Sequence, residues 1–340
     1  MNLPTTIANN MNVADFMAEV GTSWNQGLSL ACHMNRLDLV NHMISEGADH
    51  WNCGMDAACK GGHLDLANLM ITKGADYWDR GLRGACQGGH LDLANLMMSK
   101  GADNWNWGMA GACRGGHLDM VNLMISHGAD DWDRGLRGAC FGGHLDLVNL
   151  MITNGANDWG RGLRFACQGG HLDLANLMIS HGANNWNWGM AGAFQGGHLD
   201  LVDLMITKGA NNWNDGMGAA CQRGHLDLVS LMISKGADNW NLGLLGSCGG
   251  YHPDTPNVIQ CAKLMISKGA NHNGLLKNSK NLFLYRLYCQ NHAVHDVKRL
   301  HKLIREQDPL YTLVKHYDAG SVPLNELPMD LLRYCKSFLS

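Results

Sequence analysis

Apolar and polar positions recur along most of the chain with a step of 27 residues. The stretch from Trp78 to Asn104 shows the unit: WDRGLRGACQGGHLDLANLMMSKGADN. Leu93, Leu96 and Met97 are spaced by three and four residues, which places them on one face of a helix. Self-similarity at this period indicates a stacked repeat protein, in which each unit buries its apolar face against its neighbours.

Two residue types recur at this 27-residue spacing; we call each set of equivalent positions a column. The tryptophan column holds Trp24, Trp51, Trp78, Trp105, Trp132, Trp159, Trp186, Trp213 and Trp240. The histidine column holds His63, His90, His117, His144, His171, His198 and His225. We therefore expect an N-terminal cap over 1–23, nine repeats over 24–272 with a longer last unit of 33 residues, a helical C-terminal cap over 273–319, and a separate segment over 320–340.

Each unit is predicted to fold as two short helices. In the unit that begins at Trp78, an inner helix is expected over 80–87 and an outer helix over 91–99, separated by Gly88 and Gly89. Asp79 is the expected N-cap, because its side chain can accept from free N–H groups of the first turn. Its column elsewhere holds Asn25, Asn52, Asn106, Asp133, Asn187, Asn214 and Asn241, with Gly160 as the departure.

The outer half of the unit resembles a known repeat family. GGHLDLANLMMSKGA is similar to the second half of an ankyrin repeat, whose pattern is GHLEVVKLLLEHGAD. GLRGAC stands where ankyrin repeats carry TPLHLAA, and the period is about six residues short of the usual ~33. The missing residues fall where ankyrin repeats project a β-hairpin finger, for example at 103–106. The resemblance implies an all-α, ankyrin-like helical-repeat solenoid with shortened fingers and helical caps, which serves as a protein-interaction surface.

Bulk properties give no support to a membrane or nucleic-acid partner. The 340 residues carry a net charge of −4, and 16% of them are charged. No apolar run approaches the ~20 residues of a membrane helix. The first 20 residues lack a basic region and a long apolar stretch, so we expect a cytoplasmic protein, not a secreted one.

The cysteines are predicted to be reduced core residues. Eight of the 12 share one repeat column: Cys32, Cys59, Cys86, Cys113, Cys140, Cys167, Cys221 and Cys248. Packed helices lie ~8–10 Å apart, whereas a disulfide needs Cα atoms within ~7 Å. Phe194 replaces cysteine in one unit, which suits a buried apolar position.

No residue constellation indicates catalysis, a cofactor or a metal. Equivalent histidines of the recurring HLD triplet should lie one repeat apart, too far to share a zinc ion. We expect each ring to hydrogen-bond backbone groups of a neighbouring unit. The tryptophan column is predicted to be structural, as a ladder buried between the loops.

Two columns vary while their surroundings repeat, and they are the candidate binding face. Arginine and tryptophan, the residues enriched at interface hot spots, dominate them. The predicted stripe is Arg80, Arg83, Trp107, Arg134, Arg137, Arg161, Arg164 and Trp188. It would suit an acidic peptide or protein surface. A solvated face is the alternative, because Asp79 and Asp133 neighbour two of the arginines, and single-stranded nucleic acid is a further one, opposed by the acidic total charge.

The last residues resemble the start of an F-box, whose core reads LPxELLxxIxSFL. The matching residues are Leu327, Pro328, Asp330, Leu331, Leu332, Ser337, Phe338 and Leu339. An ankyrin array followed by such a segment is similar to the ankyrin proteins of poxviruses and other large DNA viruses. The resemblance implies a location in the cytoplasm or nucleus of the host cell. That resemblance implies docking on Skp1 and recruitment of a cullin ubiquitin ligase. The alternatives are a helix that packs on the preceding cap, and a scaffolding protein with no ligase link.

Overall fold

The computed structural model describes residues 24–249 and 256–270. The expected N-terminal cap (1–23), the C-terminal cap (273–319) and the F-box-like segment (320–340) lie outside the described residues. Within the described ranges the chain forms 18 α-helices and no strand. The predicted all-α helical-repeat solenoid is therefore confirmed for this part of the chain.

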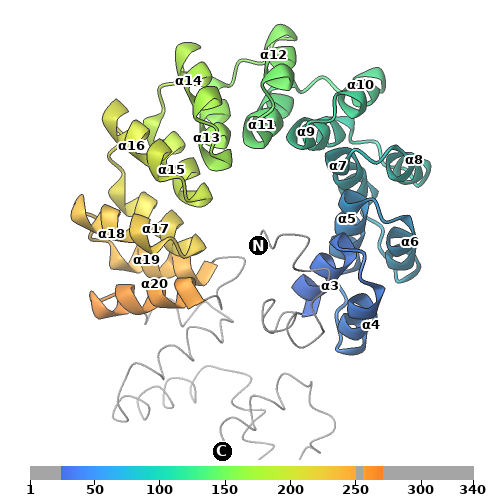
Figure 1. The fold of residues 1–340 in the computed structure, drawn as a ribbon, viewed down its shortest axis with the longest axis horizontal. Helices are drawn as coiled ribbons and strands as arrows, with labels where there is room; N and C mark the ends of the chain where they lie inside the picture. Colours follow the sequence, from blue (N-terminus) through green and yellow to red (C-terminus); the bar gives the residue numbers. More distant parts are fainter. Residues whose placement is uncertain (1–23, 250–255, 271–340) are drawn as a thin grey trace, which may run out of the picture. The chain divides into compact units, whose positions relative to one another are not determined.

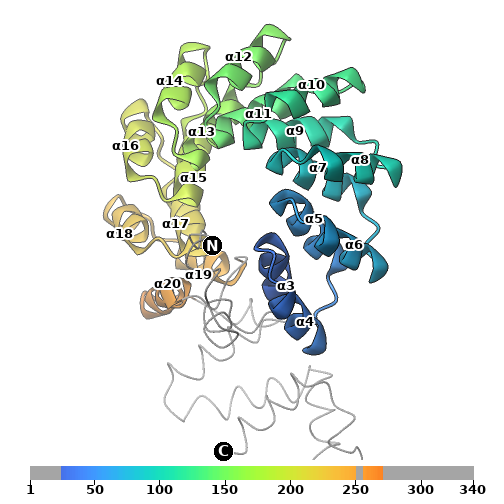
Figure 2. The same ribbon diagram turned by 45° about the vertical axis from the view of Figure 1, so that its right-hand side comes forward.

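The helices alternate between two rows (Figure 1). The inner row contains α3 (Trp24–His33), α5 (Trp51–Gly61), α7 (Trp78–Gly88), α9 (Trp105–Gly115), α11 (Trp132–Gly142), α13 (Trp159–Gly169), α15 (Trp186–Gly196), α17 (Trp213–Arg223) and α19 (Trp240–Gly249). The outer row contains α4 (Leu37–Ser45), α6 (Leu64–Thr72), α8 (Leu91–Ser99), α10 (Leu118–Ser126), α12 (Leu145–Thr153), α14 (Leu172–Ser180), α16 (Leu199–Lys208), α18 (Leu226–Ser234) and α20 (Pro256–Ser267). The turned view shows the same order of pairs (Figure 2).

The same apolar positions form the core in every unit. In the pair α7 and α8, the side chains of Leu82, Ala85, Cys86, Leu93 and Met97 are all 0% exposed. Burying one large apolar side chain contributes about 1.5–3 kcal/mol. A single pair cannot enclose these side chains, so the stacking of neighbouring units provides the core.

Seven of the eight cysteines of the column are buried, as predicted. Cys86 and its equivalents from Cys32 to Cys221 are fully buried, and Cys248 is partly exposed. The cysteines among the described residues are free thiols. Burial raises the pKa of the Cys86 thiol to about 12. Phe194 takes the same buried position in its unit.

The outer helix agrees with the prediction, but the inner helix begins earlier than predicted. The outer helix α8 spans Leu91–Ser99 as predicted, and Gly89 ends α7 in the left-handed region with φ 77°. The inner helix begins at Trp78, two residues before the expected start. The prediction that Asp79 is the N-cap is wrong, because the N-cap position is the residue before the tryptophan. In the next unit Asn104 occupies it and accepts from the Trp107 N–H at 3.1 Å.

Asp79 and its equivalents instead tie the start of each inner helix to the loop that ends the same unit. The Oδ1 atom of Asp79 accepts from the backbone N–H groups of Asp103 and Asn104, both at 2.9 Å. The same pair of bonds is made by Asn25, Asn52, Asn106, Asp133, Asn187 and Asn214. We call this interaction the loop clamp. It satisfies backbone donors in a finger that has been reduced to a few residues.

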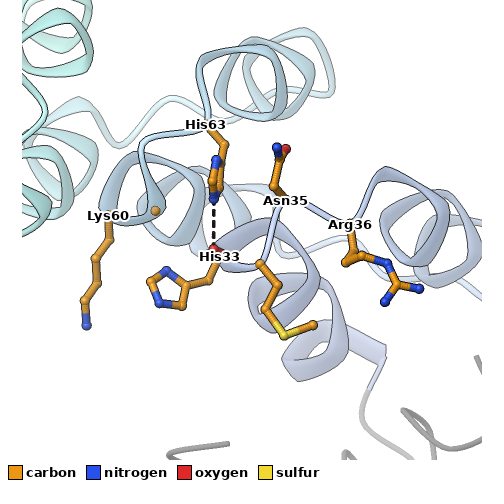
Figure 3. Close-up of a pocket in the computed structure, with 7 residues that line it drawn as sticks. His33, Asn35, Arg36, Lys60 and His63 are labelled. Carbon is orange, nitrogen blue, oxygen red and sulfur yellow. Dashed lines mark hydrogen bonds between the residues drawn. The ribbon is translucent and has the colours of Figure 1, made fainter. Parts of the chain in front are cut away.

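Two residues of the histidine column, His63 and His171, make the predicted backbone contacts. His63 reaches the carbonyl oxygen of His33 with its Nε2 at 3.0 Å (Figure 3), and His171 reaches that of Phe141 at 3.2 Å. A carbonyl oxygen only accepts, so each ring nitrogen donates. Each bond runs from one unit to the C-terminal end of the preceding inner helix.

The tryptophan column is not the buried ladder that we predicted. All nine side chains are half-buried. Trp105 stacks on His127 with ring centroids 4.7 Å apart, and Trp159 stacks on His181 at 4.5 Å. Each tryptophan is the first residue of its inner helix, and the rings of Trp105 and Trp159 stack on a histidine at the end of their own outer helix instead of entering the core.

Candidate functional site

The eight residues of the predicted stripe all lie on consecutive inner helices, from α7 to α15. On each helix the two variable positions are three residues apart, so they lie on the same face. Trp107 and Trp188 are 40% and 45% exposed, and the arginines are half-buried or exposed. The structure therefore places the stripe on one solvent-accessible side of the inner row.

Five of the eight residues line one open hollow of about 690 Å³. We call it the arginine hollow. Its lining consists of Arg134, Arg137, Arg161, Arg164 and Trp188 from the stripe, together with Asp131, Asp133 and Phe165. These residues come from α11, α13 and α15 and from the loop before α11. Four arginines against two aspartates leave the lining positively charged.

Two of the four arginines are held by carboxylates. The Nε of Arg134 donates to Asp131 at 2.9 Å, and a guanidinium N–H of Arg161 donates to Asp158 at 3.1 Å. Both aspartates are also N-caps, because each accepts from the backbone N–H of the same arginine. These exposed ion pairs add about 0–1 kcal/mol of stability each, but they fix where the two guanidinium groups lie.

The other two arginines have no carboxylate partner among residues 24–249 and 256–270. The Nε of Arg137 donates to the backbone carbonyl of Asp133 at 3.1 Å, which leaves its outer N–H groups available. The Nε of Arg164 is shielded from solvent and makes no hydrogen bond there. An N–H group shielded from solvent is also shielded from a ligand, so the outer N–H groups of Arg164 are the ones that can meet an acceptor in the hollow.

The remaining stripe residues form a second cluster around Asp56, a residue that the sequence analysis missed. Asp56 lies on α5 and accepts from Arg80 at 3.1 Å and from Arg83 at 3.0 Å. The Arg83 guanidinium also lies 5.9 Å from the centre of the Trp107 ring. Asp56 occupies the column of Arg83 one unit earlier, so the repeat step could have identified it.

A third variable column, at the end of each inner helix, was also missed. It contains Lys60, Arg114 and Phe141, and the Arg114 guanidinium lies 3.8 Å from the centre of the Phe141 ring. Burial lowers the pKa of Lys60 and of Arg114, and the charge of Arg83 lowers both further. The basic character of the face therefore extends beyond the two columns that we selected.

Another hollow, of about 590 Å³, lies between the first two units (Figure 3). His33, Arg36, Lys60 and His63 line it together with Met34, Asn35 and Gly61. Arg36 pairs with Asp38 at 2.7 Å. Burial lowers the pKa of His33, with a smaller contribution from the charge of Lys60. This hollow is basic, but it has no aromatic wall.

Neither a metal centre nor a membrane span is found in the described part of the chain. No group of three or more His, Cys, Asp or Glu residues could hold a metal ion there. None of these helices is long and apolar enough to cross a bilayer.

Comparisons with known proteins find a likeness among solved structures. No family model matches the chain, and no curated protein is similar to it. Among solved structures, the human ASB11 ankyrin repeat domain is 20% identical, with 46% of this chain and 83% of that chain covered and a TM-score of 0.29. This is the type of repeat that the sequence resembles. At this TM-score the helix pairs themselves, not the comparison, establish the fold.

Proposed function

We propose that the chain is a non-enzymatic protein-interaction solenoid that binds an acidic segment of a partner along its inner helices. The observation that carries the proposal is the pair Arg137 and Arg164, two guanidinium groups without a carboxylate partner beside the half-exposed Trp188. Arginine and tryptophan side chains on a preorganised surface are the usual anchors of protein interfaces. Unpaired guanidinium groups on that surface favour carboxylates.

A protein partner fits this face better than nucleic acid does. Asp131 and Asp133 line the arginine hollow, and Asp56 lies within the neighbouring cluster. A polyphosphate backbone lying along the row would meet these carboxylates near α5 and α11, whereas a peptide can place its acidic groups away from them. The net charge of −4 also gives no long-range attraction for a polyanion.

We propose further that the chain is a cytoplasmic adaptor, on the strength of its sequence. The segment 327–339 carries the F-box-like residues, and an apolar helix there would require a partner. Skp1 and a cullin ligase are the proposed partners of that segment. The free, buried thiols support a reducing compartment. The alternative remains a scaffold that binds its target without any ligase.

The acidic-segment proposal is tested with labelled peptide pools. Fluorescence anisotropy would compare nine-residue pools rich in glutamate, in glutamine and in lysine, with the full chain and its R137Q/R164Q double variant. We expect the glutamate pool to bind best and to lose about tenfold or more in affinity with the double variant. Equal binding of the glutamate and glutamine pools would contradict the proposal.

The adaptor proposal needs a separate experiment. Purified Skp1 is titrated against the full chain and against a chain truncated after Asp318. Binding to the full chain alone supports the adaptor. Absence of binding to both leaves the scaffold as the better description.

A further inference from the structure

We propose that the arginine hollow accepts the dianionic phosphate group of a phosphorylated side chain in the partner. The inference rests on the proposed function and narrows it, because it names the chemical group that occupies this part of the inner face. The solenoid would then bind phosphorylated partners in preference to partners that carry only acidic residues.

The first argument is the number of arginines in the hollow that form no ion pair with a carboxylate. Arg134 and Arg161 are balanced by Asp131 and Asp158, whereas no carboxylate of the described residues balances Arg137 or Arg164. A phosphate monoester carries a charge of about −1.5 to −2 at pH 7. Asp133 also lines the hollow but pairs with neither guanidinium group, so one such dianion can contact both unpaired groups at once, whereas a carboxylate brings a single charge to them.

The second argument is geometric. Arg137 and Arg164 occupy the same column on the consecutive helices α11 and α13, and both line the hollow. Packed helices lie about 8–10 Å apart, so two long arginine side chains can converge on one group between them. Each guanidinium presents a planar fork of N–H donors, and a phosphate offers three acceptor oxygens.

The third argument is the shape of the lining. Phe165 and Trp188 form an aromatic wall, and Trp188 is 45% exposed. A volume of about 690 Å³ is larger than one phosphate needs and lies in the range of sites for larger ligands. The hollow therefore has room for the side chain that carries the phosphate and for a neighbouring residue packed on Trp188.

The aspartates of the hollow argue against a nucleic-acid phosphate. Asp131 is held by Arg134, and Asp133 accepts two backbone N–H groups through the loop clamp. Both carboxylates are therefore fixed in place as walls of the hollow. An isolated dianion can lie between the two unpaired guanidinium groups, whereas a chain of phosphodiesters cannot avoid the walls.

The test uses four fluorescein-labelled nine-residue peptide pools that differ only in the central residue: phosphoserine, phosphotyrosine, serine or glutamate. Anisotropy titrations are run with the full chain and with R164Q, R137Q and K208Q. Lys208 ends α16 in the outer row and is exposed, so K208Q removes the same charge away from the hollow. Thermal melts by circular dichroism confirm that each variant folds.

We expect at least one phosphorylated pool to bind about tenfold or more tightly than the serine and glutamate pools. R164Q and R137Q should each lower that affinity about tenfold, whereas K208Q should change it less than twofold. The phosphorylated pool should also gain affinity as the pH rises through about 6, where the second phosphate proton is lost. The glutamate pool should show no such gain.

Several outcomes overturn the inference. If the glutamate pool binds as tightly as the phosphorylated pools and loses affinity with R164Q, the proposed function stands and the phosphate inference fails. If no pool binds, both fail. Equal losses of affinity in R164Q and K208Q would show a general charge effect. If a labelled single-stranded oligonucleotide binds more tightly than every peptide pool, the ligand is a nucleic acid and not a phosphorylated peptide.

Discussion

Gly160 leaves one loop without the clamp that its equivalents provide in the neighbouring units. In the preceding unit, Asp133 accepts from the backbone N–H groups of Asn157 and Asp158, both at 2.8 Å. Glycine has no side-chain oxygen, and no side chain in the described ranges accepts from the N–H groups of Asn184 or Asn185. The substitution Gly160→Asn should restore the clamp and stabilise the repeat array.

The magnitude follows from the two bonds and from the backbone. A hydrogen bond in a protein contributes about 0.5–1.5 kcal/mol net, so two bonds in an exposed loop should contribute about 1–2 kcal/mol. Replacing glycine within a helix adds a few tenths of a kcal/mol for asparagine and up to about 1 kcal/mol for alanine. A Cβ at position 160 meets no atom within 4 Å, so neither substitution introduces a clash.

Gly160→Ala is therefore the matched control. Without a clamp, alanine would be the more stabilising substitution because it has the higher helix propensity. With a clamp, asparagine should exceed alanine by about 0.5–1.5 kcal/mol. The assay is urea unfolding followed by circular dichroism, with hydrogen exchange at Asn184 and Asn185 as a local probe, because long repeat arrays need not unfold in two states.

Whether Gly160→Asn is more or less stable than Gly160→Ala decides whether the loop clamp contributes to stability. If Gly160→Ala is more stable than Gly160→Asn, and exchange at Asn184 and Asn185 is the same in both, the loop clamp does not contribute as argued. Asn106→Ala provides the reverse test, because Asn106 accepts two backbone bonds at 2.9 and 2.8 Å. It should destabilise the array by about 1 kcal/mol.

Three further predictions concern other parts of the described chain. Asp56→Asn should free Arg80 and Arg83 and raise the affinity for the glutamate peptide pool severalfold in anisotropy titrations; unchanged affinity would show that these arginines do not bind acidic groups. Cys86 should react with a thiol reagent at pH 8 only after unfolding, because it is fully buried and its thiol pKa is raised to about 12; fast labelling of the native protein, mapped by mass spectrometry, would contradict this. Burial lowers the pKa of His33, so the unfolded chain binds the proton more readily than the folded one. The free energy of unfolding should therefore fall as the pH drops below about 6.5, and His33→Gln should reduce that slope in urea titrations at pH 5.5 and 7.5.

The fold was readable from the sequence because each unit repeats the same burial pattern. The outer helix over 91–99 and the left-handed Gly89 follow from apolar spacing and from the lack of a side chain, both local properties. The helix start was not readable, because the unit offers two candidate cap residues, such as Asn104 and Asn106. Only the hydrogen bonds of Asn106 to a loop 24 residues away show that it is the clamp and not the cap.

The candidate site was predictable only to the level of columns. Variable positions three residues apart on a helix must share a face, so the arginines and tryptophans of the stripe were found together. Which arginine is balanced depends on side-chain rotamers. Arg161 turns to the cap residue Asp158, whereas Arg164, one turn further, meets no carboxylate. The column of Lys60 and Arg114 varies as well. It lies near the end of the inner helix, so the sequence did not show that it shares a face with the arginine stripe.

Variation within a repeat is therefore a weaker sign of binding than an unbalanced charge is. Asp56 varies as freely as the arginines of its column, yet it serves the chain itself by balancing Arg80 and Arg83. In the arginine hollow, the same kind of column leaves Arg137 and Arg164 without such a residue. Since the stack is held by the repeated core and by the loop clamps, nothing in its stability requires two unbalanced guanidinium groups at one place. Their presence is explained more simply by an anion that arrives from outside the chain.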